Sequence, residues 1–325
     1  MVLTDHPWPD VTIERELIEG AGYQLIAGPV TAGSAQQVEA LVAEHDPVAI
    51  MTCWAQVSEQ AIQLPSQLRI VARMGVGLDN IQVAAATERG AWVTNVPDYC
   101  VEEVSDHAIA LLLAAWRGVA YLDGRAKQGE WRPEAAPSLK RVREQCVAII
   151  GYGRTGALTA RKLREGFGCQ VLVNSPSLLR RYADGTALTS HIQVANWQRI
   201  QQQADAIVLH LPLTPTSQHL IDHEFLQGCR RQPWLVNVSR GGLVDTAALM
   251  AALSCGQVSG AALDVVEGEP APPVELLQRP EVIITPHIAF SSAASLRELR
   301  IRVCEEVLRV LHGGQPLHPC NRLNN

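Results

Sequence analysis

Three segments in the second half of the chain each place an ionisable side chain soon after an apolar run. Arg240 follows one such run, Glu269 comes a few residues after the next, and His287 follows the last. Each alone has an ordinary structural explanation: a surface ion pair, a turn carboxylate or a buried polar side chain. Residues just beyond the carboxyl ends of strands in an open parallel sheet face the ligand crevice. Together, the three predict a guanidinium, a carboxylate and an imidazole at one ligand site.

A further apolar run, near the middle of the chain, opens into a glycine-rich turn. The segment reads Val147-Ala-Ile-Ile-Gly151-Tyr-Gly153-Arg-Thr-Gly156, and a helical pattern follows it. The first two glycines allow a tight turn against a pyrophosphate, and the third lets the helix pack on its strand. The helix N-terminus adds unpaired N–H groups and partial positive charge. A glycine turn can also bind nothing, but the flanking strand and helix favour a dinucleotide site.

The end of the next strand bears on which nicotinamide dinucleotide is bound. An Asp or Glu about 20 residues beyond the turn normally holds the ribose hydroxyls of NAD. Here the strand ends in Asn174-Ser175-Pro176, and Arg180 and Arg181 follow closely. Guanidinium groups can bind a 2′-phosphate bidentately, although both arginines can equally belong to a solvated helix start. We therefore favour NADP(H) and keep NAD(H) open.

Short apolar strands alternate with helical patterns on both sides of the turn, as in parallel sheets covered by helices. The predicted strands cover residues 23–27, 47–52, 68–73, 92–96, 147–150, 171–173, 206–210, 234–238, 260–264 and 282–285. Predicted helices cover residues 35–44, 102–119 and 293–311, and the second is long enough to join two domains. Residues 123–145 are polar and less periodic, which predicts either an exposed loop or an arm that packs on a partner subunit.

Length and composition fit two domains of an ordinary globular protein. The chain has 325 residues, 47% hydrophobic and 18% charged, which excludes a large disordered part. A net charge of −6 argues against a nucleic-acid surface. Neither a signal-peptide pattern nor a membrane-length apolar run occurs, so we expect a cytoplasmic protein.

Eight cysteines occur without a C-x-x-C pair. In a chain with a real core they are predicted to be free thiols in a reducing compartment. The alternative is that one cysteine is catalytic, and Cys100 is the candidate. No metal site is predicted.

The order of motifs over nearly the whole chain resembles the D-isomer specific D-2-hydroxyacid dehydrogenase family. Its markers are Gly75-Val-Gly77-Leu-Asp79-Asn80, the glycine turn, Leu211-Pro-Leu-Thr, Asn237-Val-Ser-Arg240-Gly-Gly, Leu263-Asp264 through Glu269-Pro270, and Pro286-His287. Asn95-Val-Pro-Asp-Tyr-Cys-Val-Glu-Glu-Val and Gly153-Arg-Thr-Gly are similar to the branch that includes the C-terminal binding proteins. The resemblance implies an α/β fold of two doubly wound parallel-sheet domains. A Rossmann cofactor domain, residues 98–291, would be inserted into a flavodoxin-like substrate domain, residues 1–97 and 292–325.

The resemblance also implies roles for individual residues in hydride transfer between NAD(P)H and a small 2-oxo acid. Arg240 would hold the substrate carboxylate, His287 would be the general acid or base, and Glu269 would orient the imidazole. Implied substrate contacts are Val76, Gly77, Tyr99, Arg240, His287 and Phe290, although Tyr99 and Phe290 can equally be hydrophobic filler. Implied cofactor contacts are Tyr152, Gly153, Arg154, Thr155, Gly156, Asn174, Ser175, Arg180, His210, Leu211, Pro212, Thr216, Val238, Ser239, Arg240, Asp264 and His287. The family pattern further implies a homodimer through the cofactor domain.

Some alternatives stay open from the sequence. A dehydrogenase-shaped protein could recruit partners in a dinucleotide-dependent manner with little turnover, in the way of a corepressor. Arg73 either binds a second anionic group of the substrate or forms a structural ion pair. An L-specific malate or lactate enzyme does not fit, because its glycine turn would lie near the N-terminus. The chain departs from the family pattern at Ser175, where a carboxylate is usual, and at Gln82, where Asp is common.

Overall fold

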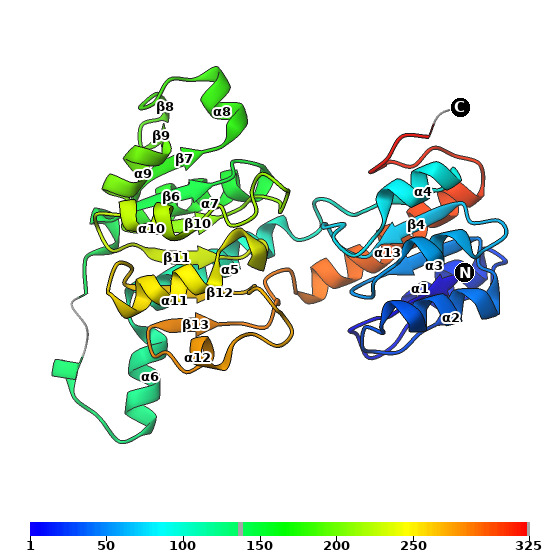
Figure 1. The fold of residues 1–325 in the computed structure, drawn as a ribbon, viewed down its shortest axis with the longest axis horizontal. Coiled ribbons are helices and arrows are strands. Elements are labelled where there is room, and N and C mark those ends of the chain that lie inside the picture. Colours follow the sequence, from blue (N-terminus) through cyan, green and yellow to red (C-terminus); the bar gives the residue numbers. More distant parts are fainter. Residues whose placement is uncertain (136–138, 324–325) are drawn as a thin grey trace. The chain divides into compact units, whose positions relative to one another are not determined.

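The computed structural model describes residues 1–135 and 139–323, and it divides into two compact units (Figure 1). The first unit comprises Met1–Tyr99 and Ser292–Asn325, and the second comprises Cys100–Ser291. Each unit is built on its own sheet. The α/β class with parallel sheets and two domains, predicted from the sequence, is confirmed.

The first unit contains a five-stranded sheet in the order β2-β1-β3-β4-β5, with every pairing parallel. Its strands are β1 (Val2–Leu3), β2 (Ile26–Ala27), β3 (Ala49–Thr52), β4 (Ile70–Arg73) and β5 (Trp92–Thr94). This is the flavodoxin-like order of a doubly wound sheet. Strand β1 has no counterpart among the sequence predictions.

The helices of the first unit are α1 (Thr12–Gly20), α2 (Ala35–His45), α3 (Glu59–Gln63), α4 (Val83–Arg89) and α13 (Ala293–Leu311). Helix α13 begins at a capping box formed by Ser292 and Ser295. It packs against α1 and β4. A bidentate ion pair joins the two helices: the Arg300 guanidinium lies 2.6–2.7 Å from both carboxylate oxygens of the buried Glu14. This ion pair fixes α13, with which the chain returns to the first unit, to helix α1 near the N-terminus.

The second unit contains an eight-stranded sheet in the order β13-β12-β11-β10-β6-β7-β9-β8. Its strands are β6 (Cys146–Ile150), β7 (Gln170–Asn174), β8 (Ala187–Thr189), β9 (Ile192–Val194), β10 (Ala206–Leu209), β11 (Trp234–Asn237), β12 (Gly260–Leu263) and β13 (Val282–Ile284). The central strands are buried along their whole length, as expected when helices cover both faces. From β9 to β12 the order is that of a Rossmann fold. Only β8 is antiparallel among the described strands, and this short, mostly exposed strand was not predicted from the sequence.

The helices of the second unit are α5 (Val101–Trp116), α6 (Val119–Lys127), α7 (Arg154–Phe167), α8 (Pro176–Arg181), α9 (Trp197–Gln203), α10 (His223–Gly228), α11 (Thr246–Ser254) and α12 (Val274–Leu277), with short 3-10 turns at Pro133–Ala135, Val142–Glu144 and Gly241–Leu243. The continuous helix predicted over 102–119 is wrong at its end. Gly118 adopts a left-handed conformation (φ 62°) and separates α5 from α6. Residues 136–138 of the predicted loop or arm lie outside the described part.

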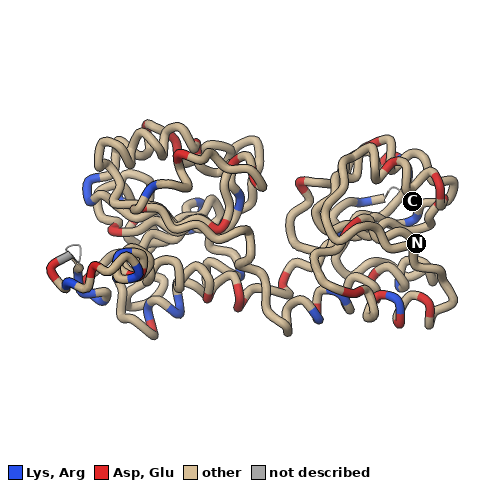
Figure 2. The backbone as a smooth tube through the Cα atoms, turned by 90° about the horizontal axis from the view of Figure 1, so that it is seen from below, with Lys and Arg blue, Asp and Glu red and all other residues tan. Residues whose placement is uncertain are grey.

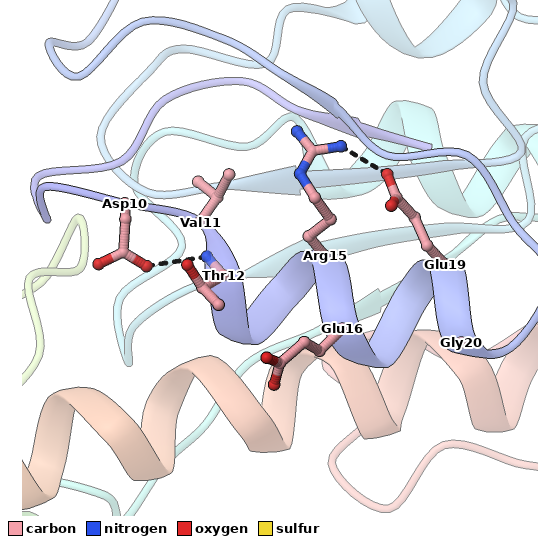
Figure 3. Close-up of a pocket in the computed structure, with 7 residues that line it drawn as sticks. All are labelled: Asp10, Val11, Thr12, Arg15, Glu16, Glu19 and Gly20. Carbon is pink, nitrogen blue, oxygen red and sulfur yellow. Dashed lines mark hydrogen bonds and ion pairs between the residues drawn. The ribbon is translucent and has the colours of Figure 1, made fainter.

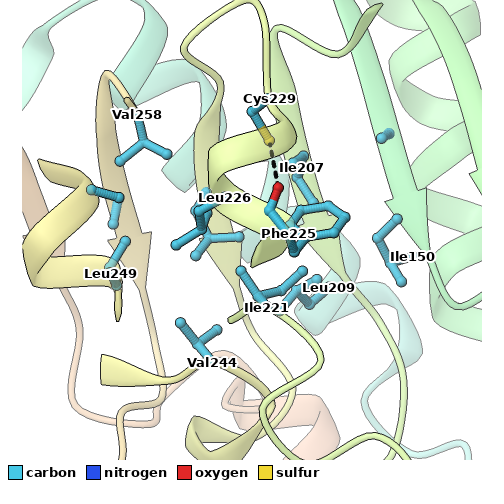
Figure 4. Packing of buried hydrophobic residues seen from close by; sticks show 14 of the residues in the cluster. Ile150, Ile207, Leu209, Ile221, Phe225, Leu226, Cys229, Val244, Leu249 and Val258 are labelled. Atoms are coloured by element: carbon cyan, nitrogen blue, oxygen red, sulfur yellow. Dashed lines mark hydrogen bonds between the residues drawn. The ribbon is translucent and has the colours of Figure 1, made fainter. Parts of the chain in front are cut away.

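Apolar side chains fill the space between the central strands and the helices of the second unit. One cluster joins Phe225 and Leu226 on α10 to Ile207 and Leu209 on β10 and to Leu249 on α11 (Figure 4). Charged residues of both signs are interspersed on the outer helices and loops of both units (Figure 2). No helix in the described part of the chain is long and apolar enough to cross a membrane.

Candidate active site

The carboxyl ends of β11, β12 and β13 lie level with one another at one edge of the second sheet. The parallel register pairs Asn237 with Leu263 and Leu263 with Ile284, which are the last residues of these strands. Arg240, Glu269 and His287 all belong to the segments that follow. The sheet therefore brings the three predicted segments to one edge of one unit.

His287 and Glu269 form a hydrogen-bonded pair in this region. The imidazole Nδ1 lies 2.8 Å from Glu269 Oε1, and the side chains are 23% and 39% exposed. The Phe290 ring lies edge-on to the imidazole, with 6.5 Å between the ring centroids. The carboxylate therefore engages the Nδ1 side of the ring.

His287 has an unusual backbone conformation that its surroundings must maintain. Its φ is 53°, in the left-handed region that side chains other than glycine rarely adopt. Its backbone N–H donates to the carbonyl oxygen of Asp264 at 2.8 Å. The buried Asp264 carboxylate accepts the N–H groups of Ile288 and Ala289, each at 2.9 Å, and the hydroxyl of Thr285 at 2.6 Å. The predicted cofactor residue Asp264 thus holds the turn that carries His287.

Arg240 follows β11 on a backbone packed tightly against the Glu269 segment. Its Nη1 donates to the carbonyl oxygen of Ser239 at 2.7 Å, and its own carbonyl accepts from Asn237 Nδ2 at 2.8 Å. A Cβ atom at the adjacent Gly241 would lie 2.2 Å from the backbone of Val266. The glycine after Arg240 is therefore required by the close approach of these two segments.

In the turn between β6 and α7, two glycines are packed against backbone atoms and the third has open space beside it. A Cβ at Gly151 would lie 2.1 Å from the carbonyl oxygen of His210, and one at Gly156 would lie 2.0 Å from that of Gly151. A Cβ at Gly153, the N-cap residue of α7, would meet no atom within 4 Å. Space for a pyrophosphate therefore remains at the start of the helix, next to its unpaired N–H groups. Tyr152, Arg154 and Thr155 lie in the same partly exposed turn.

His210, after β10, contributes a buried polar atom beside this turn. Its Nε2 is buried without a hydrogen-bond partner in the described part of the chain. Burial lowers the pKa of His210 to about 4, so its ring is neutral near physiological pH. Of the other predicted contacts on this edge, Val238 is buried, Leu211 and Ser239 are half-buried, and Pro212 and Thr216 are exposed. An open glycine turn and an unsatisfied imidazole together fit a dinucleotide.

Two side chains at the end of β7, Asn174 and Ser175, already form hydrogen bonds within the protein. Asn174 is buried and donates to the carbonyl oxygen of Ala195 at 2.7 Å. Ser175 Oγ accepts the N–H of Leu178 as the cap of α8 and lies 3.0 Å from Ser177 Oγ. Arg180 and Arg181 are exposed on α8. No acidic side chain occurs between β7 and the end of α8.

The remaining predicted substrate contacts belong to the first unit. Val76 is 43% exposed, and its carbonyl accepts from Asn95 Nδ2 at 2.6 Å. Tyr99 is buried, whereas Gly77 is half-buried. Arg73 is buried, donates to the Met74 carbonyl at 2.5 Å and lies 5.4 Å from the Trp54 ring centroid. These predicted substrate contacts therefore belong to a different unit from Arg240 and His287.

A hollow of about 600 Å³ lies elsewhere on the first unit, beside α1 (Figure 3). It is lined by Asp10, Val11, Thr12, Arg15, Glu16, Glu19 and Gly20. Arg15 pairs with Glu19 there, and Asp10 accepts the N–H of Thr12. Since every lining residue belongs to one helix and its start, and none is a predicted site residue, we assign this hollow no role.

Six of the eight cysteines are buried: Cys53, Cys100, Cys146, Cys169, Cys229 and Cys304. Burial raises the pKa of the Cys53, Cys146 and Cys304 thiols to about 12, which disfavours the reactive thiolate. Cys100 is buried at the start of α5. Within the described residues, no group of three His, Cys, Asp or Glu side chains could hold a metal ion.

Two doubly wound sheets, one with an open glycine turn after a central strand, define an α/β protein that binds a dinucleotide. Residues 109–289 match the NAD-binding domain of the D-isomer specific 2-hydroxyacid dehydrogenases. The glyoxylate reductase of Korarchaeum cryptofilum is 35% identical over 270 residues, which cover 82% of this chain and 80% of that enzyme. The chain belongs to the D-isomer specific 2-hydroxyacid dehydrogenase family, as the motifs predict, and is an NAD(P)-dependent oxidoreductase.

Further relatives and solved structures resemble the chain over most of its length. The D-3-phosphoglycerate dehydrogenase of Mycobacterium leprae is 35% identical over 274 residues, 84% of this chain but only 51% of that enzyme. The chain thus spans about half the length of that relative. The structure of the TT0316 protein from Thermus thermophilus matches with a TM-score of 0.87 and 28% identity, over 98% of this chain and 99% of that one. A D-lactate dehydrogenase from Aquifex aeolicus, solved with NAD and lactic acid, shares the fold at 24% identity, with a TM-score of 0.82 and 96% of both chains covered.

Proposed function

We propose that the protein reduces a small 2-oxo acid to the D-2-hydroxy acid, and can catalyse the reverse oxidation. The observation that carries this proposal is the His287–Glu269 pair, 2.8 Å between nitrogen and oxygen, on a turn held by the buried Asp264. A histidine oriented by a carboxylate at the ligand edge of a dinucleotide-binding sheet is suited to general acid–base chemistry. The bound nicotinamide would supply or accept the hydride.

The protein's own side chains would bind the substrate and move its proton. Arg240 binds the carboxylate of the 2-oxo acid through its forked donors, which also polarise the ketone. His287 gives the Nε2 proton to the carbonyl oxygen as it becomes a hydroxyl, and takes it back in the oxidation. Glu269 fixes the orientation of the imidazole through Nδ1. Phe290, whose ring lies edge-on to the His287 imidazole, contacts the substrate from the same unit. Val76, Gly77 and Tyr99 stay predicted substrate contacts on the first unit.

The glycine turn and its neighbours would hold the dinucleotide. Gly153, Arg154, Thr155 and the start of α7 bind the pyrophosphate, since the space beside Gly153 is open. Ser175 and Arg180 face the adenosine ribose, where no carboxylate repels a 2′-phosphate. NADP(H) is therefore the favoured cofactor. The remaining cofactor contacts are those proposed from the family resemblance.

We propose a small substrate without a second anionic group, such as glyoxylate or pyruvate. The Arg73 guanidinium already donates to the Met74 carbonyl and lies over the Trp54 ring, which favours a structural role. The glyoxylate reductase relative, of which the match covers 80%, is named for such a small acid. A homodimer formed through the second unit completes the proposal, with α6 and the segment after it as the interface.

Steady-state kinetics would test the proposed activity. Purified protein is incubated with NADPH or NADH and glyoxylate, pyruvate, hydroxypyruvate or a phosphorylated 2-oxo acid, and loss of nicotinamide absorbance is followed. We expect turnover with the small acids and little gain from a phosphate group. Dinucleotide binding without turnover on any of these acids would contradict the proposal and favour a partner-recruiting protein.

A further inference from the structure

His107, a residue absent from the predicted site, lies behind the turn that carries His287. It belongs to α5, and its Nε2 is 2.9 Å from Thr285 Oγ1 and 3.5 Å from Asp264 Oδ1. The side chain is 23% exposed, and the Asp264 side chain is almost fully buried. Helix α5 itself packs against α7, β11 and β12, so this imidazole is presented by a firmly held element.

The direction of these hydrogen bonds follows from counting protons. The Thr285 hydroxyl has one hydrogen, and its 2.6 Å contact with Asp264 Oδ1 uses it, since a carboxylate can only accept. Thr285 Oγ1 must therefore accept from His107, whose Nε2 carries the hydrogen. The result is a directed series of hydrogen bonds, from His107 to Thr285 to Asp264. The same Asp264 carboxylate accepts the N–H groups of Ile288 and Ala289.

The turn needs such support for two reasons. His287 is held at a positive φ, and residues in that region persist only where the surrounding contacts determine them. The second unit also ends at Ser291, two residues after Ala289, so no later segment of that unit holds the turn. Helix α5 begins one residue inside the same unit, at its other chain connection. The His107–Thr285 contact therefore joins the first and last segments of the unit at the His287 turn.

We propose that His107 is a positioning residue for His287: through Thr285 and Asp264 it holds the 285–289 turn and so aims the imidazole. The proposal rests on the proposed function, because it assigns His287 to the proton transfer. Loss of the Nε2 donor leaves Thr285 Oγ1 without its donor and loosens the turn. Misplacement of a reacting group by about 1 Å can cost on the order of 100-fold in rate. His107 therefore affects kcat and leaves dinucleotide binding nearly unchanged.

Two substitutions of His107 separate the hydrogen bond from the space that the ring fills. His107→Leu keeps an apolar side chain of similar size and removes the donor, whereas His107→Gln retains an N–H donor at similar reach. We expect His107→Leu to lower kcat by about 10- to 100-fold with little change in the Kd for NADPH. His107→Gln should recover most of that loss. An unchanged kcat in His107→Leu, or equal losses in both variants, would overturn the proposal.

A double-mutant cycle tests the route through Thr285. Thr285→Val removes the hydroxyl at nearly constant volume, and Thr285→Ser is the matched control that keeps it. If His107 acts through Thr285, the double variant His107→Leu/Thr285→Val loses no more activity than the worse single variant. Multiplicative losses would show that the two residues act independently, which would contradict the proposal.

A readout independent of turnover separates this proposal from the proposed function. In protein with isotope-labelled histidine, the ring resonances of His287 should move in His107→Leu and return toward the wild-type position in His107→Gln. Absence of turnover in the wild type would overturn the proposed function. The His287 resonances would still test whether His107 positions His287. A His287 signal that is the same in all three proteins would overturn the positioning role.

Discussion

We propose that Ser175 lies where a carboxylate would meet the adenosine ribose of NAD. Its hydroxyl caps α8 by accepting the Leu178 N–H. Aspartate is an equally good helix cap, so Ser175→Asp should retain the fold. Its charge would repel a 2′-phosphate, and we expect the affinity for NADPH to fall by about 10-fold or more while NADH binding is maintained.

Fluorescence titration with both dinucleotides measures this change in preference. Ser175→Asn is the matched control, because asparagine caps a helix without adding charge. If Ser175→Asp and Ser175→Asn bind NADPH equally well, residue 175 does not face the phosphate.

At the scale of single residues, sequence reasoning found the side chains that follow strands but missed those that support them. Arg240, Glu269 and His287 are marked by their position after apolar runs. His107 meets Thr285 across 178 positions of sequence, and no local pattern records that contact. The engagement of Asp264 with backbone N–H groups depends likewise on a turn geometry that only the fold creates.

At the scale of elements, two glycines of the turn between β6 and α7 allow helix packing and dinucleotide binding to be tested separately. Gly156→Ala places a Cβ 2.0 Å from a backbone oxygen, and we expect a loss of about 1–3 kcal/mol or more in the free energy of unfolding. Gly153→Ala meets no atom within 4 Å and should cost at most about 1 kcal/mol. It should nevertheless weaken dinucleotide binding, because its methyl group enters the open space.

Denaturant unfolding and dinucleotide titration of the two variants check this contrast. Normal dinucleotide binding by Gly153→Ala would exclude that side of the turn as the pyrophosphate site. A fully stable Gly156→Ala protein would contradict the close packing of α7 against β6.

The loop between β12 and Glu269 is held by a second pair, His219 and Glu267. His219 Nε2 lies 2.6 Å from Glu267 Oε1, and Glu267 Oε2 accepts the N–H and hydroxyl of Thr246. The hydrogen bond to Glu267 raises the pKa of His219, helped by the charges of Glu267, Asp245 and Asp222. Burial opposes ionisation of Glu267, but hydrogen bonds from His219 and Thr246 lower its pKa overall.

The stability that this pair contributes should depend on pH in a defined direction. Because the pKa of His219 is higher in the folded protein, its contribution is complete below the unfolded value of 6.5 and is lost as pH rises through the folded value. We expect His219→Gln to cost about 0.2–1 kcal/mol in mildly acidic solution, since the pair is partly exposed, and less at higher pH. Denaturant unfolding across this range measures the difference, and a difference that grows with pH would contradict the assignment.

Elements were predictable from sequence where burial is continuous. The strands on both sides of the glycine turn are near-unbroken apolar runs, and α13 (Ala293–Leu311) has the bounds predicted for it. Strands β1, β8 and β9, each two or three residues long, have no counterpart among the predicted strands. The end of α5 was missed because a single left-handed glycine, rather than a change in apolar periodicity, stops the helix.

At the scale of the whole molecule, we propose that α6 and the segment after it form the interface of a homodimer. None of the residues in α6 is buried, and Val119 and Trp131 are 55% and 87% exposed. Buried aromatic side chains contribute most to interfaces. We expect Trp131→Asp to shift the protein from dimer toward monomer in light scattering coupled to size-exclusion chromatography. Glu134→Gln, at another exposed position of the same segment, is the control; a dimer unaffected by Trp131→Asp would place the interface elsewhere.

The central claim is that His287 moves the substrate proton, while most of the contacts that hold the dinucleotide come from other residues. His287→Asn tests it most directly, because asparagine tolerates the positive φ of this position but cannot act as a general acid or base near neutral pH. The measurement compares kcat for glyoxylate reduction and the Kd for NADPH in the wild type and this variant. We predict that kcat falls by about 100-fold or more while the Kd changes little. Near-normal turnover by His287→Asn would contradict the account.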